Sequence, residues 1–321
     1  MRSLYYEEYG AVDVLSLGET APPEIADDEM LIRVRAASLN PVDWKLRSGL
    51  LRDFFDPEFP IVPGRDGCGE IVQLGAAVGG LQLDDGQLVS FISSRLNQGS
   101  MAELAAVKAR DNVVPVAKAL SIQESSALPL VGLSAWNALV ETAEIRAGMR
   151  VLIHGGSGGV GTVAIQIARH FGAEVFATCR SANVERVAML GAQPIAYDTT
   201  DFTTVLAECD VVLDTVGGQV HEDSYKVLKR GGRLVYLLAR PFNDLSDSFG
   251  VADRQVNVYG NTANLRKVID LAEQGVIRPV IGHSLQLADF KEAFQLGEAG
   301  NAGGKIVLTV NNGGGPHGSL P

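Results

Sequence analysis

The chain has 321 residues, of which 46% are hydrophobic and 20% charged, and its formal net charge is −11. This length suits two domains with cores of their own. The acidic balance, without a basic run, argues against nucleic acid or an anionic membrane as a partner. No apolar stretch is long enough to span a membrane, and the N-terminal residues have no apolar signal region. We therefore expect a soluble globular protein.

The cysteines Cys68, Cys179 and Cys209 are far apart and odd in number, and none belongs to a C-x-x-C motif. This usage excludes a disulfide framework and favours a reducing, cytoplasmic setting. The final residues, 311–321, are rich in glycine and polar residues and are expected to form a loose tail.

Residues 1 to about 120 are expected to be mostly β-structure, because short apolar runs alternate with turns. Met30 to Ala36 alternates apolar and polar residues, as a half-buried strand does. Further strands are expected at Gly69–Leu74, Gln87–Ile92 and Ala102–Val107, with glycine turns at 79–80 and 85–86. A helix is expected from Ser121 to Val140, because Ser121 and Glu124 form a capping-box pattern.

From Val151 onward, strands and helices alternate. Val151 to Ile153 is expected to be a buried strand, a glycine-rich turn follows, and a helix is expected from Thr162 to Phe171. A second strand is expected from Glu174 to Thr178, which completes a βαβ unit.

The turn contains G-x-G-x-x-G at Gly156, Gly158 and Gly161. The first glycine permits a tight turn, the second lets the backbone approach a pyrophosphate, and the third lets the helix pack on the strand. The helix N-terminus offers N–H groups to the phosphates. This context predicts a dinucleotide site rather than a plain structural turn.

The end of the second strand indicates which dinucleotide binds. NAD sites usually place Asp or Glu there, but this strand ends Thr178-Cys179-Arg180-Ser181, with Arg186 further on. A guanidinium suits a 2′-phosphate, so the sequence favours NADPH over NADH. The alternative is that Arg180 is a solvated arginine and Ser181 only the N-cap of the next helix.

The remaining elements continue the alternation. Helices are expected at Val184–Leu190, at roughly His221 to Lys229 and at Leu265–Gln274. Strands are expected at Gln193–Tyr197, Asp210–Asp214, Arg233–Leu237 and Lys305–Val310.

The chain resembles, over nearly its full length, the zinc-free quinone oxidoreductase (zeta-crystallin-like) branch of the medium-chain dehydrogenase/reductases. The matching stretches are A-A-S-L-N-P-V-D-W-K-L-R-S-G (36–49), P-G-R-D-G-C-G-E-I-V (63–72), G-S-M-A-E-L (99–104), L-P-L-V-G-L-S-A-W-N-A-L (128–139), the glycine turn (155–161), D-T-V-G-G (214–218) and G-K-I-V-L (304–308).

The resemblance implies an α/β fold in two domains. A GroES-like, β-rich catalytic domain would comprise residues 1–120 and 265–321, and a Rossmann NADP-binding domain with a doubly wound parallel sheet would comprise 121–264. The active site would lie in the cleft between them, and the protein would be a homodimer. The loop at 240–250 is expected to be mobile and near the substrate.

The resemblance also shows where the zinc ligands of related alcohol dehydrogenases are missing. Asn40 stands at the position of the first cysteine, and Gly64-Arg65-Asp66 stands where those relatives have G-H-E. The lobe with four closely spaced cysteines is absent, and the five histidines show no ligand spacing. A metal site is therefore not expected, and His154 is expected to pack or hydrogen-bond beside the glycine turn.

Without zinc, the expected chemistry is hydride donation from NADPH to an acceptor that conjugation already activates, such as a quinone or an α,β-unsaturated carbonyl. Two alternatives stay open. One is a 2-enoyl thioester reductase with the same hydride step, and the other is a non-catalytic NADPH-binding protein.

The resemblance assigns site residues, each with a plainer alternative. Asn40 and Lys45 are the catalytic candidates; otherwise Asn40 is a turn residue before Pro41 and Lys45 a solvated surface lysine. Asp43 is expected to form a structural ion pair. Trp44 and Phe54 would wall the substrate pocket, or serve as ordinary core.

The cofactor candidates come mainly from the second domain. Ser134 would contact the nicotinamide end, or is an interior helix serine bonded to its own backbone, and Tyr197 would lie by the adenosine, or is a strand-end aromatic. Lys305 would reach the cofactor, or is a surface lysine. The other candidates are Gly156, Ser157, Gly158, Gly159, Val160, Gly161, Arg180, Ser181, Thr215 and Gly217.

Overall fold

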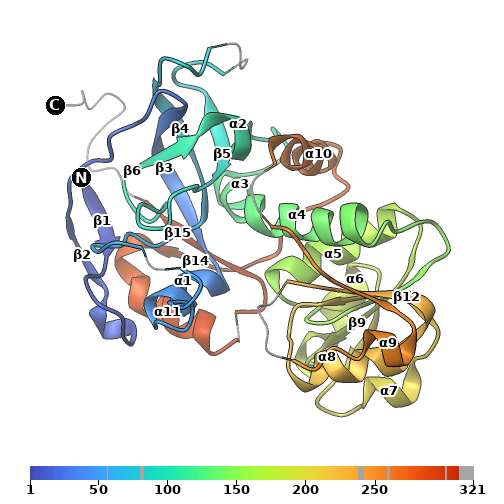
Figure 1. The fold of residues 1–321 in the computed structure, drawn as a ribbon. Helices are drawn as coiled ribbons and strands as arrows, with labels where there is room; N and C mark the ends of the chain where they lie inside the picture. Colours follow the sequence, from blue (N-terminus) through green and yellow to red (C-terminus); the bar gives the residue numbers. More distant parts are fainter. Residues whose placement is uncertain (56, 80–82, 238–241, 259–260, 301, 311–321) are drawn as a thin grey trace. The chain divides into compact units, whose positions relative to one another are not determined.

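The computed structural model describes residues 1–55, 57–79, 83–237, 242–258, 261–300 and 302–310. The chain divides into two compact units (Figure 1): Met1–Pro129 with the segment from Ile281 onward, and Leu130–Val280. The sequence analysis placed these boundaries at 120/121 and 264/265. The return to the first unit comes later because α10 (Thr262–Glu273) belongs to the second unit, where Asn264 Nδ2 donates to Asn137 Oδ1 at 3.0 Å.

The first unit is built on a seven-stranded sheet, which agrees with the predicted β-rich domain. The strand order is β14-β15-β3-β4-β5-β7, and β6 pairs with residues 29–33 of β3, before the part of β3 that pairs with β15. All pairs are antiparallel except β14–β15. The bounds are β3 Glu29–Leu39, β4 Asp66–Leu74, β5 Leu88–Ile92, β6 Leu104–Lys108, β7 Val113–Pro115, β14 Ile281–Gln286 and β15 Lys305–Thr309, and β1 Arg2–Tyr5 pairs separately with β2 Ser16–Glu19.

The long strand β3 is more buried than a half-buried strand. Only Arg33 and Arg35, near its middle, are partly exposed. The helices α3 (Ile122–Ala127) and α11 (Phe290–Glu298) contact β3, while β4, β6 and β15 pair with its edges.

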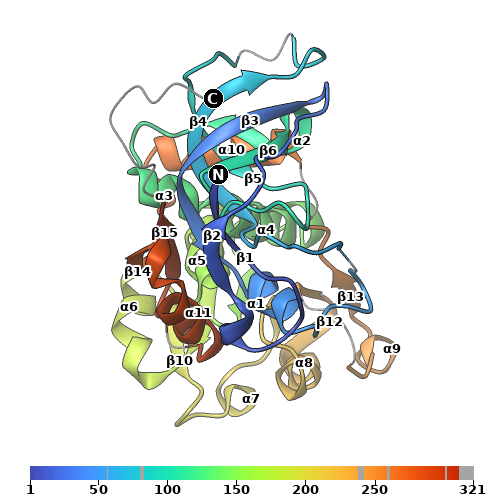
Figure 2. The same ribbon diagram turned by 90° about the vertical axis from the view of Figure 1, so that its left-hand side faces the viewer.

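The two longest helices of the first unit, α1 (Pro41–Arg47) and α11 (Phe290–Glu298), were not predicted. They pack through Arg47, whose buried guanidinium lies 2.9 Å from Glu298 and 5.5 Å from the centre of the Phe294 ring. Figure 2 shows α11 beside β14 and β15. The other helices of this unit are η1 Val12–Val14, α2 Ala109–Asn112, α3 Ile122–Ala127 and η5 Leu287–Asp289.

The second unit holds a six-stranded, fully parallel sheet of order β10-β9-β8-β11-β12-β13. Chain order reverses between β8 and β11, which is the switch point of a doubly wound sheet, so the predicted fold class is confirmed. The central residues Val151 to Ile153 are fully buried. The bounds are β8 Arg150–Ile153, β9 Glu174–Cys179, β10 Gln193–Ala196, β11 Cys209–Asp214, β12 Leu228–Tyr236 and β13 Ala252–Gln255.

The structure corrects two helix predictions. The Ser121–Glu124 capping box is confirmed, but the helix expected to reach Val140 is three pieces, because Pro129 begins a new helix. The helix expected over 221–229 ends before β12. The bounds are α4 Pro129–Trp136, η2 (a π-helix) Asn137–Thr142, α5 Gly159–His170, η3 Ser181–Asn183, α6 Val184–Met189, α7 Phe202–Val205, α8 Gln219–Ser224, η4 Tyr225–Val227 and α9 Ser246–Phe249.

Three sequence predictions fall partly or wholly outside the described residues. They are the tail at 311–321, the turn at 79–80 and the start of the loop at 240–250. Within that loop, residues 246–249 are the helix α9, and Phe249 packs against the core of the second unit. In the described part of the chain, no helix is long and apolar enough to cross a membrane.

Candidate functional site

The glycine turn packs closely against the strands around it. A Cβ atom on Gly161 would lie 2.1 Å from the carbonyl oxygen of Gly155, and one on Gly156 would lie 2.7 Å from the Cβ of Ala177. A Cβ on Gly158 would meet only the Gly155 carbonyl oxygen, at 3.3 Å. The first and third glycines of the motif are therefore required by packing, whereas the second leaves space above the turn.

Helix α5 begins at Gly159, three residues before the predicted start, because Gly158 caps it in an extended conformation. The first-turn N–H groups of Gly159, Val160 and Gly161 have no carbonyl four residues earlier within the helix. These donors, with the positive end of the helix dipole, suit an anion such as a pyrophosphate.

His154, just before the glycine turn, is a buried anchor. Its Nδ1 lies 3.0 Å from Thr178 Oγ1 on β9, and its Nε2 lies 3.0 Å from Ser224 Oγ on α8. Thr215 Oγ1 donates to the His154 carbonyl oxygen at 2.8 Å. Burial lowers the pKa of His154 to about 4, so the ring is neutral at pH 7. The expected hydrogen bonding of His154 is confirmed.

At the end of β9, the predicted phosphate residues lie together on the surface. Arg180 Nε donates to the Tyr197 hydroxyl at 2.9 Å, and the Tyr197 side chain is 51% exposed. Ser181 donates from its N and Oγ to Asp198, at 2.9 and 2.6 Å. The hydrogen bonds to Ser181 lower the pKa of Asp198.

Asp198 lies beside these candidates and was not predicted. The sequence has no carboxylate at the end of β9, but Asp198 follows the neighbouring strand β10. The parallel pairing of β9 with β10 brings the two strand ends together. Ser181 is the first residue of η3 and not an N-cap, so its proposed capping role is wrong.

The turn after β11 lies beside the glycine turn, because β11 pairs with β8. The buried Asp214 carboxylate accepts from the N–H groups of Val216 and Gly217 through one oxygen, at 2.8 and 2.9 Å. Gly217 has a φ of 83°, and the Val216 side chain is 53% exposed. Thr215 and Gly217 thus lie at the carboxyl edge of the sheet, where ligands bind in open α/β folds.

In the first unit, Asn40 is the centre of a buried polar cluster. Its Nδ2 donates to Asp66 Oδ1 at 2.8 Å and to the Ser38 carbonyl oxygen at 3.1 Å. Its Oδ1 accepts from Lys305 Nζ, which also donates to the Leu39 carbonyl oxygen at 3.1 Å. Lys305 is 4% exposed, so its interpretation as a surface lysine is wrong.

Asp43 belongs to the same cluster through backbone contacts rather than the expected ion pair. Its carboxylate accepts from Asn40 N at 2.8 Å and from Gly64 N at 3.0 Å. Burial raises the pKa of Asp43 to about 6. The Gly64 contact needs glycine, since φ is 103° and a Cβ would lie 2.5 Å from Ser100 Oγ.

The family resemblance predicts that Asn40 corresponds to a zinc ligand of alcohol dehydrogenases, but the residues of this cluster do not suit a metal. The Asn40 oxygen and both of its amide hydrogens already have partners, and a lysine amino group lies against it. Among the described residues, no group of three or more His, Cys, Asp or Glu side chains could hold a metal ion.

The four remaining candidates, Lys45, Trp44, Phe54 and Ser134, differ in how far they are buried. Lys45 is half-buried on α1, and Trp44 packs against the core, where a Cβ on Gly297 would lie 3.2 Å from its ring. Phe54 is 62% exposed. Ser134 is buried on α4.

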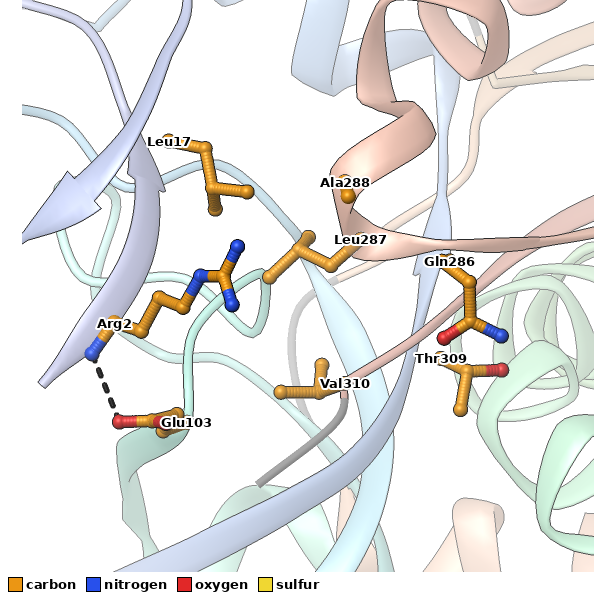
Figure 3. Close-up of a pocket in the computed structure, with 8 residues that line it drawn as sticks. All are labelled: Arg2, Leu17, Glu103, Gln286, Leu287, Ala288, Thr309 and Val310. Atoms are coloured by element: carbon orange, nitrogen blue, oxygen red, sulfur yellow. Dashed lines mark hydrogen bonds between the residues drawn. The ribbon is translucent and has the colours of Figure 1, made fainter. Parts of the chain in front are cut away.

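Figure 3 shows a small pocket of the first unit that contains none of these candidates. Its volume is about 50 Å³. Because ligand pockets usually measure about 300–1,000 Å³, this space suits water rather than a substrate. The lining residues are Arg2, Leu17, Glu103, Gln286, Leu287, Ala288, Thr309 and Val310.

Comparison with known proteins places both units among oxidoreductases. Residues 26–118 match a family described as "Alcohol dehydrogenase GroES-like domain", and residues 190–308 match one described as "Zinc-binding dehydrogenase". Similar relatives include 2-methylene-furan-3-one reductase of Solanum lycopersicum, with 36% identity over 96% of this chain and 79% of that protein.

Two further proteins extend the comparison. NADPH-dependent alkenal/one oxidoreductase, chloroplastic, of Arabidopsis thaliana is 33% identical over 96% of this chain and 79% of the relative. The solved structure of the quinone oxidoreductase from Coxiella burnetii superposes with a TM-score of 0.88 and 30% identity, covering 97% of this chain and 99% of that one.

Proposed function

The chain belongs to the medium-chain dehydrogenase/reductase superfamily, in the branch with quinone oxidoreductases and enone reductases, and we propose that it transfers a hydride from NADPH to a quinone or an α,β-unsaturated carbonyl without a metal ion. It is an oxidoreductase that uses a nicotinamide cofactor. The proposed acceptors follow those for which its relatives are named.

The observation that carries the preference for NADPH is Arg180 at the end of β9. A guanidinium there is suited to a 2′-phosphate, which it can hold with charge-assisted hydrogen bonds. The Tyr197 hydroxyl accepts from Arg180 Nε and so orients the guanidinium. Asp198 opposes this preference, because its carboxylate lies beside the proposed position of the 2′-phosphate and would repel it.

The remaining cofactor residues act mainly through the backbone. The N–H groups at the start of α5, together with the turn at Gly156, Ser157 and Gly158, would hold the pyrophosphate. Thr215 and Gly217 would border the cofactor at the neighbouring strand end, and Ser134 would contact the nicotinamide end. When bound, the cofactor supplies a hydride from C4 of its nicotinamide ring, and the chain's part is to bind, orient and exclude water.

Metal independence is supported by the hydrogen bonding around Asn40. Zinc requires several Cys, His or acidic ligands that converge at close range. Here Asn40 is already bonded to Lys305 and Asp66, so we assign it the role of organising this buried cluster. Lys45 remains a candidate for stabilising negative charge on a substrate oxygen.

The test is cofactor oxidation by the purified protein, with NADPH compared to NADH. The acceptors are 1,4-benzoquinone and a short 2-alkenal. Faster turnover with NADPH on either acceptor would support the proposal, and the ratio of the two acceptors would identify the substrate class. Turnover of a 2-enoyl thioester alone would favour the alternative thioester reductase, and turnover with NADH alone would contradict the role of Arg180.

We also propose that the protein is a homodimer in a reducing compartment such as the cytoplasm. The family resemblance supports a dimer, for which the edge strands β10 and β13 are candidates. Three free, buried cysteines agree with a reducing environment. Light scattering should give twice the 34.0 kDa chain mass, and fractionation of cells should test the location.

A further inference from the structure

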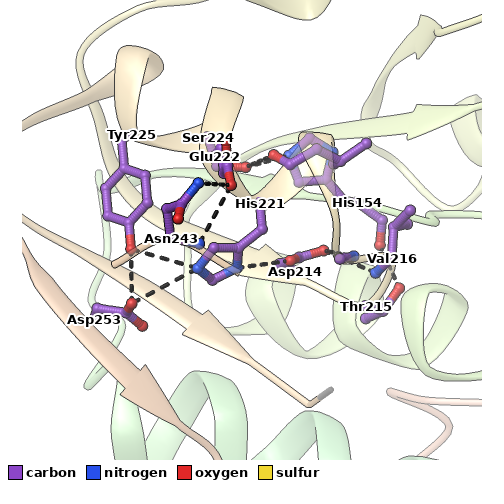
Figure 4. A network of polar contacts seen from close by, with 12 residues as sticks. His154, Asp214, Thr215, Val216, His221, Glu222, Ser224, Tyr225, Asn243 and Asp253 are labelled. Atoms are coloured by element: carbon purple, nitrogen blue, oxygen red, sulfur yellow. Dashed lines mark hydrogen bonds and ion pairs between the residues drawn. The ribbon is translucent and has the colours of Figure 1, made fainter. Parts of the chain in front are cut away.

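A buried histidine lies beneath the turn that follows β11. His221 is on α8 and is fully buried, and Figure 4 shows its ring between Asp214 and Asp253. Its Nδ1 lies 2.9 Å from Asp214 Oδ2, and its Nε2 lies 3.7 Å from Asp253 Oδ2. Because Asp253 is on β13, which does not pair with β11, the ring connects two separated strands of the sheet.

The Asp214 carboxylate connects His221 to the backbone of the turn. One oxygen faces His221, and the other accepts from Val216 N and Gly217 N. The histidine therefore fixes the rotation of a carboxylate whose second oxygen fixes the backbone of residues 216 and 217. Thr215, between them and the strand, is tied to the His154 carbonyl oxygen beside the glycine turn.

The other side of the ring is arranged for a second ring proton. The Tyr225 hydroxyl donates to Asp253 Oδ2 at 2.7 Å, so its oxygen is left to accept from His221 Nε2 at 3.4 Å. A neutral ring with its proton on Nδ1 would instead turn an unprotonated nitrogen towards these two oxygens. The surroundings thus favour the doubly protonated ring.

We propose that His221, as an imidazolium, is a positioning residue that holds the Thr215–Gly218 turn in the conformation that binds the nicotinamide cofactor. This inference rests on the proposed function, which places the cofactor at the carboxyl edge of this sheet. No part of His221 needs to touch the cofactor, because Asp214 transmits its effect.

The groups that face His221 define its protonation. They are Asp214 from β11, Asp253 from β13, Tyr225 from η4 and, at longer range, His154, with the rings of Tyr236 and Phe242 packed on it. Burial opposes the charge, but Asp214 and Asp253 outweigh burial and raise the pKa of His221 to about 9. His221 is therefore an imidazolium at pH 7 and holds the turn, and it loses this charge in alkaline solution.

The test combines two measurements, on the wild type and on His221→Asn. The first is amide hydrogen exchange at Val216 and Gly217, without cofactor, at pH 7 and 9.5. The second is the Kd for NADPH and NADH over the same range. His221→Asn keeps a neutral donor towards Asp214 but loses the charge and the link to Asp253.

Once normalised for the intrinsic pH dependence of exchange, the protection of these amides in the wild type should fall between pH 7 and 9.5. The cofactor should bind roughly fivefold to tenfold more weakly at the higher pH, a range typical of coupling between sites. His221→Asn should bind weakly at both pH values, with a flat profile. Asp253→Asn should move the midpoint of the wild-type profile to lower pH, because one of the two acidic partners of His221 becomes neutral.

The matched control is His170→Asn, an exposed histidine at the end of α5, which should leave both profiles unchanged. A folded His221→Asn variant with wild-type Kd and pH profile would overturn the inference. Changed amide exchange with an unchanged Kd would also overturn it, because His221 would then stabilise the turn without affecting cofactor binding. If the wild type bound neither cofactor, the proposed function would fall, whatever the exchange data showed.

Discussion

Arg180, which follows β9, and Tyr197, which follows β10, are joined by a hydrogen bond of 2.9 Å from Nε to the hydroxyl oxygen. The two residues come from the ends of neighbouring parallel strands, and both lie on the surface. The contact directs the guanidinium along this edge of the sheet, where the adenosine end of a dinucleotide binds in doubly wound folds.

Replacing Arg180 with Ala should weaken NADPH binding by about 1.5–3 kcal/mol, the usual loss for a hydrogen bond to a charged group. NADH binding should change much less, because NADH has no 2′-phosphate. Kd values for both cofactors, from fluorescence titration, check this. Arg266→Ala, which replaces an exposed arginine on α10, is the control. Equal losses for the two cofactors would show that Arg180 does not read the phosphate.

Replacing Asp198 with Asn should have the opposite effect. The amide keeps an oxygen that can accept from Ser181 but removes a negative charge beside the proposed 2′-phosphate. For an exposed pair of charges, we expect NADPH to bind on the order of twofold to fivefold more tightly, with NADH unchanged. The gain should shrink in high salt. An unchanged ratio of the two Kd values at low salt would place the phosphate away from Asp198.

These two residues illustrate what the sequence could and could not reveal. The βαβ unit and its glycines were predictable because the pattern is local and its neighbours have clear periodicity. Asp198 was missed because its place at the site depends on the pairing of β9 with β10. Lys305 was misread for the same reason, since its partner Asn40 lies 265 residues earlier in the chain.

The unpredicted helix α1 has a related explanation. It is short, and the only structural interpretation given to Asn40 was the alternative of a turn residue before Pro41, although proline is common at the first position of a helix. Asp43, three residues after Asn40, closes the capping contact to Asn40 N. That local signal was present in the sequence, whereas the burial of Asp43 and its contact with Gly64 N depend on tertiary structure.

Replacing Lys305 with Met should destabilise the first unit. The substitution leaves the buried Leu39 carbonyl oxygen and the Asn40 side-chain oxygen without their shared donor, which costs about 1–3 kcal/mol. Urea denaturation measures the loss. Lys291→Met, an exposed lysine on α11, should change stability by no more than about 0.5 kcal/mol. Equal effects of the two substitutions would remove the structural role of the Lys305 amino group.

Treatment with a strong chelator should leave NADPH-dependent turnover unchanged. The reason is that the residues around Asn40 are bonded to one another instead of converging on a metal. Metal content by mass spectrometry should also be well below one zinc per chain. Activity that is lost on chelation and restored by zinc would contradict the metal-free mechanism.

The combined contribution of two buried histidines to stability should be greatest near pH 6.5–7, because their pKa values are shifted in opposite directions. The pKa of His221 is raised to about 9, so its contribution is complete below about pH 6.5 and is lost as the pH rises towards 9. The pKa of His154 is lowered to about 4, so its contribution is complete above about pH 6.5 and is lost as the pH falls towards 4. Each effect amounts to at most about 3 kcal/mol.

Urea denaturation between pH 4 and 9.5 separates the two histidines. His221→Asn should flatten the alkaline side of the stability curve and leave the acidic slope, whereas His154→Asn should do the reverse, whatever each substitution costs at pH 7. The shape of each curve is therefore the diagnostic quantity, not its height. An alkaline slope that persists in His221→Asn would mean that another group carries the titration, and the imidazolium between Asp214 and Asp253 would have to be abandoned.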